Sequence, residues 1–215
     1  MIKSNPLFVI ITLVVVGAAV GSWVVPRLNQ AEGVPEALRG VAYAEPQPVP
    51  AFTLTDADNQ PFDRERLKNR WTFLVFGYTH CPDICPYTLG ELNHVYERLE
   101  ESNPERLADT QFVFVSVDYK RDTPATLHDY VRYFNEHFVG ATGNKAQIDD
   151  TTRKLGVGYS VKQGPTADDI EVQHSASILL VGPRAQVRGA FSPPHDPAAI
   201  TREYLAFRQL SQAAL

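Results

Sequence analysis

Both cysteines of the chain lie in one short segment, GYTHCPDICP, at positions 81 and 85. Two thiols separated by three residues can form a structural disulfide, cycle as a redox couple or bind a soft metal ion together. Helical residues i and i+4 share one face, so a helix here would point the sulfurs of Cys81 and Cys85 at the same place. The unpaired N–H groups at a helix start also favour thiolate, which predicts a lowered thiol pKa.

The spacing of the two cysteines bears on these alternatives. Redox enzymes of the thioredoxin type use two intervening residues, whereas this chain has three, which weakens the match without excluding it. A disulfide across so short a loop would remove little entropy from the unfolded chain, which disfavours a purely structural role. As metal ligands, two thiolates select Cu(I) or zinc and are naturally completed by an imidazole. The redox couple and the metal site therefore both stay open.

Six histidines could supply that imidazole. His174, in EVQHSASILLVG, immediately precedes a predicted core strand, where thioredoxin-like oxidoreductases place a proline against their cysteines; a structural role for it stays the alternative. His195 lies in a Pro-Pro-His-Asp-Pro loop and is expected to serve the turn. Met1 is the only methionine, which excludes a methionine-rich copper carrier. The remaining histidines are expected outside the site, on helices or beside the cysteines: His80, His94, His128 and His137.

The elements that position these residues follow from periodicity. The apolar run at 72–78, directly before the cysteines, predicts a buried strand, and 111–118 predicts a second. Apolar residues at three- and four-residue steps after Pro86 predict a helix. The other expected elements are a hairpin at 52–62, helices from Thr123-Pro124, over 144–155 and from Asp196-Pro197, and strands near 177–181 and 186–191. This order predicts a thioredoxin-like α/β fold with a central mixed sheet flanked by helices.

The N-terminal part predicts a membrane anchor. Residues 7–25 are uncharged and match the roughly 20 residues that cross a bilayer as a helix, after a short cytoplasmic N-terminus at 1–6. The run continues past its small residues, so we prefer an uncleaved anchor to a cleaved signal peptide. A weak positive-inside bias places the rest in the periplasm or its equivalent. Residues 26–50, rich in proline, are predicted to be a linker, or equally a segment packed on the domain at 51–215.

Length and charge limit the number of domains and the kinds of partner that the chain can have. The chain has 215 residues with 44% apolar content, enough for one well-buried core. Its net charge of −5 comes from interspersed acids and bases without a basic run, which argues against nucleic acid as a partner.

Three segments together resemble the Sco/SenC family of copper chaperones for cytochrome c oxidase assembly. They are GYTHCPDICP, SVDYKRDTP at 116–124 and HSASILLVGP from His174, behind one N-terminal anchor. The resemblance implies a site for one copper ion, Cu(I) or Cu(II), formed by Cys81, Cys85 and His174, with Asp118 close behind the ligands. The chain departs from the family pattern at two positions that bear on copper affinity: Tyr119 stands where proline is frequent and Gln173 where aspartate is frequent.

The resemblance also implies a function. It predicts a metallochaperone held at the inner membrane that delivers copper from the periplasmic side to the dinuclear copper centre of the cytochrome c oxidase subunit that carries it. The alternative is an enzyme, a thiol-disulfide oxidoreductase that keeps cuproprotein cysteines reduced. Other periplasmic copper chaperones or thiol reductants are the further partners expected. A peroxidase of the peroxiredoxin type and a zinc site are weaker alternatives, since nothing in the sequence fixes the arginine that such a peroxidase needs.

Overall fold

The structure is a computed structural model that describes residues 34–163 and 170–213. The chain divides into two compact units, Met1–Arg39 and Gly40–Leu215. The described part of the first unit contains one short 3-10 helix, η1 (Glu36–Leu38). The expected N-terminus at 1–6 and membrane-spanning helix at 7–25 lie outside the described residues. Within the part of the chain that the structure describes, no helix is long and apolar enough to span a bilayer.

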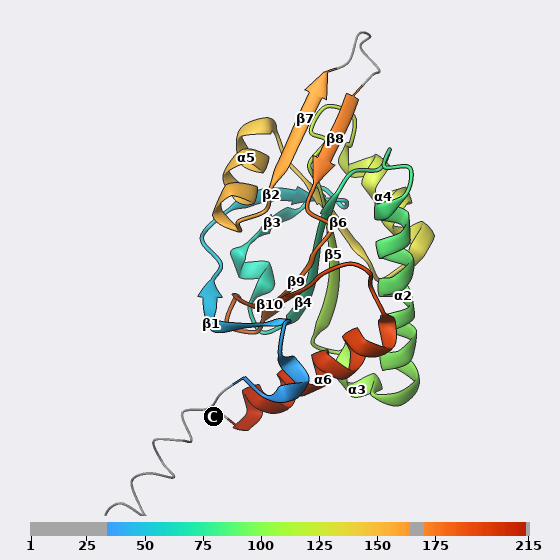
Figure 1. The fold of residues 1–215 in the computed structure, drawn as a ribbon. Coiled ribbons are helices and arrows are strands. Elements are labelled where there is room, and N and C mark those ends of the chain that lie inside the picture. The colour runs from blue at the N-terminus through green and yellow to red at the C-terminus, as the bar shows by residue number, and fades with distance from the viewer. Residues whose placement is uncertain (1–33, 164–169, 214–215) are drawn as a thin grey trace, which may run out of the picture. The chain divides into compact units, whose positions relative to one another are not determined.

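The second unit is built on a mixed sheet of eight strands in the order β1-β10-β9-β4-β5-β6-β2-β3 (Figure 1). β4, β5 and β6 are parallel to one another, and the other neighbouring strands are antiparallel. A separate pair, β7 and β8, forms a hairpin. The strands are β1 (Ala42–Pro48), β2 (Thr53–Asp56), β3 (Pro61–Asp63), β4 (Trp71–Gly77), β5 (Thr110–Ser116), β6 (Val139–Thr142), β7 (Tyr159–Gln163), β8 (Ile170–His174), β9 (Ile178–Gly182) and β10 (Gln186–Phe191).

Helices cover both sides of this sheet. Helix α2 connects β4 to β5, α4 connects β5 to β6, and α2 contacts both α4 and α6. Figure 1 shows α2 and α4 along one side of the sheet and α5 on the other. The helices are η2 (Arg64–Leu67), α2 (Ile84–Ser102), α3 (Pro104–Leu107), α4 (Pro124–Phe134), α5 (Lys145–Lys154) and α6 (Pro197–Ala213).

The two central parallel strands end at the same edge of the sheet. Every residue of β4 is buried, and so is every residue of β5 after Thr110, which explains their almost continuous apolar sequences. Their register runs from Trp71 opposite Thr110 to Gly77 opposite Ser116. The segments that leave β4 and β5 therefore begin side by side, and the first of them carries the cysteines.

Most expected elements are confirmed, including the hairpin of β2 and β3 and the antiparallel pair β9 and β10. Helix α5 begins with a capping box between Asn144 and Gln147 and is followed by Gly156 in the left-handed region. Helix α4 ends at Phe134, so His137 lies beyond it, where the sequence predicted helix.

Four strands were not expected from the sequence. β6 and the β7–β8 hairpin fall in segments predicted as connections, and β1 lies within the predicted linker at 26–50. Because β1 pairs with β10, the sheet begins at Ala42 and not at residue 51. Residues 42–48 are therefore packed on the domain, which was the alternative to a free linker. β1 is an edge strand whose residues are mostly exposed and include two prolines, so it lacks the apolar alternation that would reveal it.

Candidate metal centre

The cysteine segment forms a turn that leads into α2. The N-cap of this helix, Asp83, makes no side-chain capping bond, and the backbone N–H of Cys85 instead points at the sulfur of Cys81 with 3.5 Å between N and Sγ. Cys81 therefore contributes an acceptor that a helix start requires. Only Cys85 lies within the helix, so the turn brings the sulfurs together, and the expectation that one helix face carries both is corrected.

His174 reaches the cysteines from the end of β8. Its Nε2 lies 3.2 Å from Cys85 Sγ, and its Nδ1 lies 2.9 Å from the backbone oxygen of Ser175. A carbonyl oxygen only accepts hydrogen bonds, so this contact assigns the proton of the neutral ring to Nδ1. Nε2 therefore presents its lone pair to the sulfurs, and the Cys85 thiol donates to it.

The three predicted ligands converge. The sulfurs of Cys81 and Cys85 and a ring nitrogen of His174 all lie within 4.8 Å of one another. Both cysteines are free and buried, with exposed fractions of 8% for Cys81 and 1% for Cys85, whereas His174 is half-buried. Two thiolates and a neutral imidazole carry a charge of −1 with Cu(I) and match the preferences of a soft ion. The donor set therefore fits copper.

Burial raises the pKa of the Cys85 thiol far above its ordinary value. A backbone hydrogen bond from Tyr78 lowers this pKa, while interactions with Cys81 and the charge of Asp122 raise it further. The sequence predicted a lowered thiol pKa at the helix start, and for Cys85 that expectation is wrong because desolvation is the largest effect. A metal ion that binds here must displace the Cys85 proton.

Tyr78 contacts all three of these residues. Besides the backbone bond to Cys85, its hydroxyl hydrogen-bonds to Cys81, and its ring meets the ring of His174 edge-on with 5.8 Å between centroids. Burial and the nearby cysteines raise the pKa of Tyr78 to about 12. Its hydroxyl is therefore a neutral hydrogen-bond donor beside the site.

Asp122 holds the cysteine segment to the neighbouring loop. Its buried carboxylate accepts hydrogen bonds from the backbone N–H of Thr79 at 2.8 Å, from the Thr79 hydroxyl at 2.6 Å and from the Ser116 hydroxyl at 2.5 Å. These bonds join the residues after β4 to those after β5. The sequence analysis missed Asp122, although it belongs to the same SVDYKRDTP segment as Asp118.

Asp118 lies at the edge of this network. It is buried, its carboxylate forms an ion pair with Arg121, and its backbone N–H donates to Ser116 at 3.1 Å. Carboxylate oxygens of Asp118 and Asp122 and a ring nitrogen of His80 lie within 4.8 Å of one another. The structure thus places Asp118 near the base of the cysteine loop, and its influence on copper stays a prediction.

The other histidines lie outside the converging group. His80, His94 and His137 are exposed, and each has a carboxylate within 4.0 Å of a ring nitrogen, as does His128. His195 is buried, and its Nε2 lies 3.0 Å from the backbone oxygen of Ala176. Of the six imidazoles, the structure brings only that of His174 into a described cluster with the two sulfurs.

Residues 42–207 match the model of the SCO1/SenC family. The chain belongs to this family. It is 40% identical over 146 residues to a Stutzerimonas stutzeri protein named for copper binding, covering 68% of this chain and 70% of that protein. It is also 33% identical over 150 residues to the mitochondrial protein SCO1 homolog 1 of Arabidopsis thaliana, covering 70% of this chain and 44% of that one.

Solved structures of the SCO1/SenC family share the fold. Arabidopsis thaliana ScoI with copper bound has a TM-score of 0.68 at 32% identity, covering 74% of this chain and 98% of that one. Yeast Sco1 with copper bound has a TM-score of 0.71 at 25% identity, covering 76% and 90%. These likenesses confirm the predicted thioredoxin-like α/β fold with its central mixed sheet.

Proposed function

We propose that this SCO1/SenC protein is a copper metallochaperone that acts in cytochrome c oxidase assembly. The observation that carries the proposal is the convergence of Cys81, Cys85 and His174 within reach of one ion. The copper-bound structures of Arabidopsis and yeast relatives support copper as the cargo. The three converging ligands suit one ion per domain. The acceptor that we propose is the dinuclear copper centre of the oxidase subunit that carries it.

The geometry suits transfer by ligand exchange. The carbonyl oxygen of Ser175 keeps His174 Nε2 free of a proton, and loss of the Cys85 proton supplies the second thiolate. Three ligands leave Cu(I) open to an incoming thiolate of the acceptor, so a new bond can form before an old one breaks. Cys81 and His174 are more exposed than Cys85, so the acceptor reaches the ion from their side.

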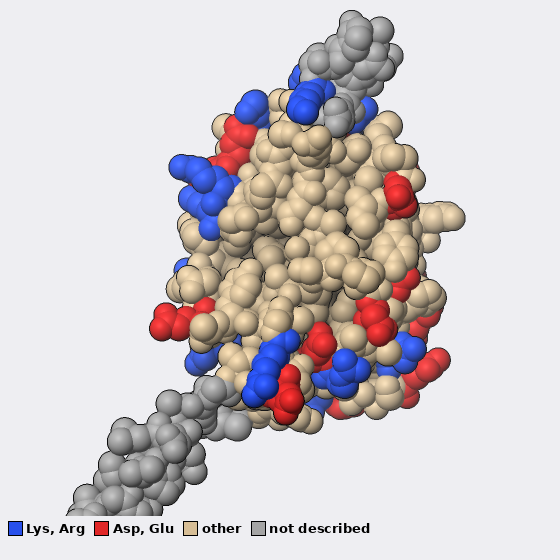
Figure 2. Space-filling view, in the orientation of Figure 1, with Lys and Arg blue, Asp and Glu red and all other residues tan. Residues whose placement is uncertain are grey.

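The surface around the site fits a partner that docks without charge pairing. In the orientation of Figure 2, the centre of the visible face lies over the end of β8 and the segment leading to β9, and it carries no lysine, arginine, aspartate or glutamate. Charged side chains lie around the edges of this face. A membrane anchor at 7–25 with the domain in the periplasm would hold this face near an oxidase in the same membrane.

Copper binding is tested on the full chain in an uncharged detergent, reduced and anaerobic, by competition with a Cu(I) chelator. We expect one tightly held ion per chain, strongly weakened in Cys85→Ser and His174→Ala. His94→Ala, which removes an exposed histidine of α2, is the matched control and should bind like the wild type. Binding that is indifferent to His174 would contradict the proposed site.

Delivery is tested by mixing the copper-loaded chain with a metal-free oxidase domain that carries the dinuclear centre. We expect copper to appear in the acceptor and to stay there when a chelator is present throughout, because exchange from ligand to ligand releases no free ion. If the chelator intercepts the copper, direct transfer is wrong even though the site binds copper.

A second function, thiol-disulfide reduction, is favoured by the two free thiols that face one another. The more exposed Cys81 thiolate attacks a partner disulfide, one partner sulfur leaves as thiolate, and a mixed disulfide forms. Cys85 then displaces the second partner sulfur, so a Cys81–Cys85 disulfide forms while the partner gains two electrons and two protons. A thiol reductant must restore the pair. His174→Ala separates the functions, since reduction should survive it and copper binding should not.

A further inference from the structure

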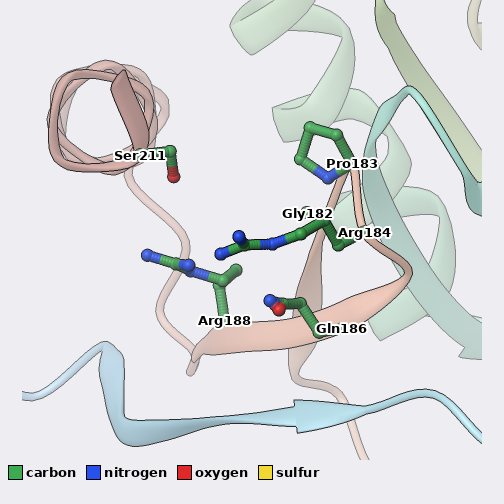
Figure 3. A pocket seen from close by; sticks show the side chains of 6 residues that line it. All are labelled: Gly182, Pro183, Arg184, Gln186, Arg188 and Ser211. Atoms are coloured by element: carbon green, nitrogen blue, oxygen red, sulfur yellow. The ribbon is translucent and has the colours of Figure 1, made fainter. Parts of the chain in front are cut away.

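A second candidate site lies at the opposite end of the sheet from the cysteines. β9 runs antiparallel to β4, with Val181 opposite Thr72, so the turn after β9 lies beside the start of β4. Here the structure has a pocket of about 130 Å³. Figure 3 shows its lining: Gly182, Pro183, Arg184, Gln186, Arg188 and Ser211.

Two arginine side chains enter this pocket together. Figure 3 shows the guanidinium groups of Arg184 and Arg188 extending side by side toward Ser211 of α6. Among the described residues, no carboxylate oxygen lies within 4.0 Å of either group, whereas Arg208 of α6 pairs with Asp109 at 2.6 Å. Partial burial lowers the pKa of Arg188, and the positive charge of Arg184 lowers it further. The two positive guanidinium groups therefore lie close together, and no carboxylate of the described residues pairs with either of them.

The remainder of the lining is uncharged and held in place. The turn is fixed by Ala185, whose φ of 52° is left-handed and whose N–H donates to the oxygen of Gly182 at 2.9 Å. The stem of Arg188 packs over Gly182, where an added Cβ would lie 3.1 Å from Arg188 Cγ. Arg184 thus projects from a turn that this hydrogen bond closes, Arg188 projects from β10, and their guanidinium donors are the charged groups of the pocket.

We propose that Arg184 and Arg188 form a binding site for the oxygens of a phosphate group. Planar guanidinium groups donate pairs of hydrogen bonds that match phosphate oxygens, and a bound phosphate removes the repulsion between the two cations. The site does not depend on the proposed copper function, because it shares no residue with the metal centre.

The phosphate can come from solution or from a phospholipid head group. β1 pairs with β10 beside this pocket, with Ala42 opposite Gly189 and Pro48 opposite Gln186. A chain that arrives from a membrane anchor therefore enters the domain next to Arg188. Only the lipid source rests on the proposed anchor, and the two sources give different results in one experiment.

The experiment uses the full chain in an uncharged detergent at constant ionic strength and follows the thermal unfolding midpoint during two titrations. The first probe is inorganic phosphate and the second is a short-chain phosphatidylglycerol below its micellar concentration. A ligand that binds the folded state raises the midpoint in a saturable way. We expect saturation with at least one probe and at least a tenfold weaker apparent affinity in the double variant Arg184→Gln/Arg188→Gln.

The matched control is the double variant Arg153→Gln/Arg202→Gln, which removes the same charge from exposed arginines that already have acidic partners. A cooperative thermal transition without added ligand shows in every variant that the domain is folded. A response to phosphate alone assigns the site to dissolved phosphate, and a response to the lipid alone assigns it to a head group. No saturable response to either probe, or equal weakening in both double variants, would overturn the proposal.

Discussion

His174 and His195 each contact a backbone carbonyl oxygen, but through different ring nitrogens, and only His174 is left with a nitrogen that can bind a metal. Each imidazole bonds a backbone carbonyl of one short segment: His174 Nδ1 lies 2.9 Å from the oxygen of Ser175, and His195 Nε2 lies 3.0 Å from the oxygen of Ala176. The remaining nitrogen of His174 faces the sulfur of Cys85, whereas the remaining nitrogen of His195 is buried and has no hydrogen-bond partner among the residues that the structure describes.

The difference shows that the choice of ring nitrogen decides what a histidine can do. When the carbonyl oxygen accepts a hydrogen bond from Nδ1–H, Nε2 keeps its lone pair at the tip of the ring, where a metal can reach it. When the carbonyl oxygen accepts a hydrogen bond from Nε2–H, the tip of the ring is occupied and the other nitrogen is buried in the protein. His195 therefore holds the segment that positions His174, and His174 acts at the sulfurs.

The largest effect on copper binding should come from substituting each of these two histidines separately. We expect His174→Ala to weaken copper binding by at least about a hundredfold, because an ion loses one of three ligands, and His195→Gln to weaken it by less than about tenfold. Competition with a Cu(I) chelator measures both. Equal losses would show that the two imidazoles do not have separate roles.

The next prediction concerns Cys85, whose sulfur faces His174, and tests whether copper binding depends on the position of that sulfur. An added Cβ at Gly77 would lie 2.6 Å from Cys85 Sγ and 2.6 Å from a ring carbon of Phe114, so Gly77→Ala should reduce the unfolding free energy by about 1–3 kcal/mol and weaken copper binding. Gly90→Ala, in α2 with open space around it, is the control.

Gly90→Ala should stabilise the chain by about 0.5–1 kcal/mol, because alanine is the better helix former, and should leave copper binding unchanged. Denaturant unfolding of both variants, with a copper titration, checks the pair. A harmless Gly77→Ala would mean that the sulfur has room to move and that the close packing around it is not required.

The sequence marked Cys81 and Cys85 by their residue type and position, and the family resemblance added His174 as the third ligand. Two cysteines after a continuous apolar strand and a histidine before another such strand have to meet when those strands are neighbours, as β4 and β9 are. The buried strands were predictable for the same reason, since burial on both faces leaves a plain apolar run.

What the sequence did not reveal depends on long-range contacts. β1 is exposed and pairs only through its backbone, so no side-chain pattern marks it. Asp118 and Asp122 look alike in SVDYKRDTP, and only the fold shows that Asp122 receives the hydrogen bonds of Thr79. The direction of the Cys85 pKa shift also needed the structure, because desolvation is not visible in a helix-start motif.

A smaller effect distinguishes these two aspartates. Asp122→Asn keeps one carbonyl oxygen for three donors and adds an N–H group, so we expect the unfolding free energy to fall by about 1–3 kcal/mol and copper binding to weaken by about tenfold as the cysteine loop loosens. Asp118→Asn alters mainly the pairing with Arg121 and should affect copper less. Unfolding and chelator competition give both values, and the reverse order would favour the role near the ligands that the family resemblance implies for Asp118.

The smallest effect returns to His195 and concerns pH. Burial lowers the pKa of His195, a shift that its bond to Ala176 and the charge of Glu91 only partly oppose. The folded state therefore prefers the neutral ring, so this contribution to stability is complete above the unfolded pKa of about 6.5 and is lost as pH falls below it. The difference in unfolding free energy between wild type and His195→Gln should shrink between pH 7 and pH 5. A difference that stays constant with pH would show that the buried nitrogen of His195 accepts a proton without cost.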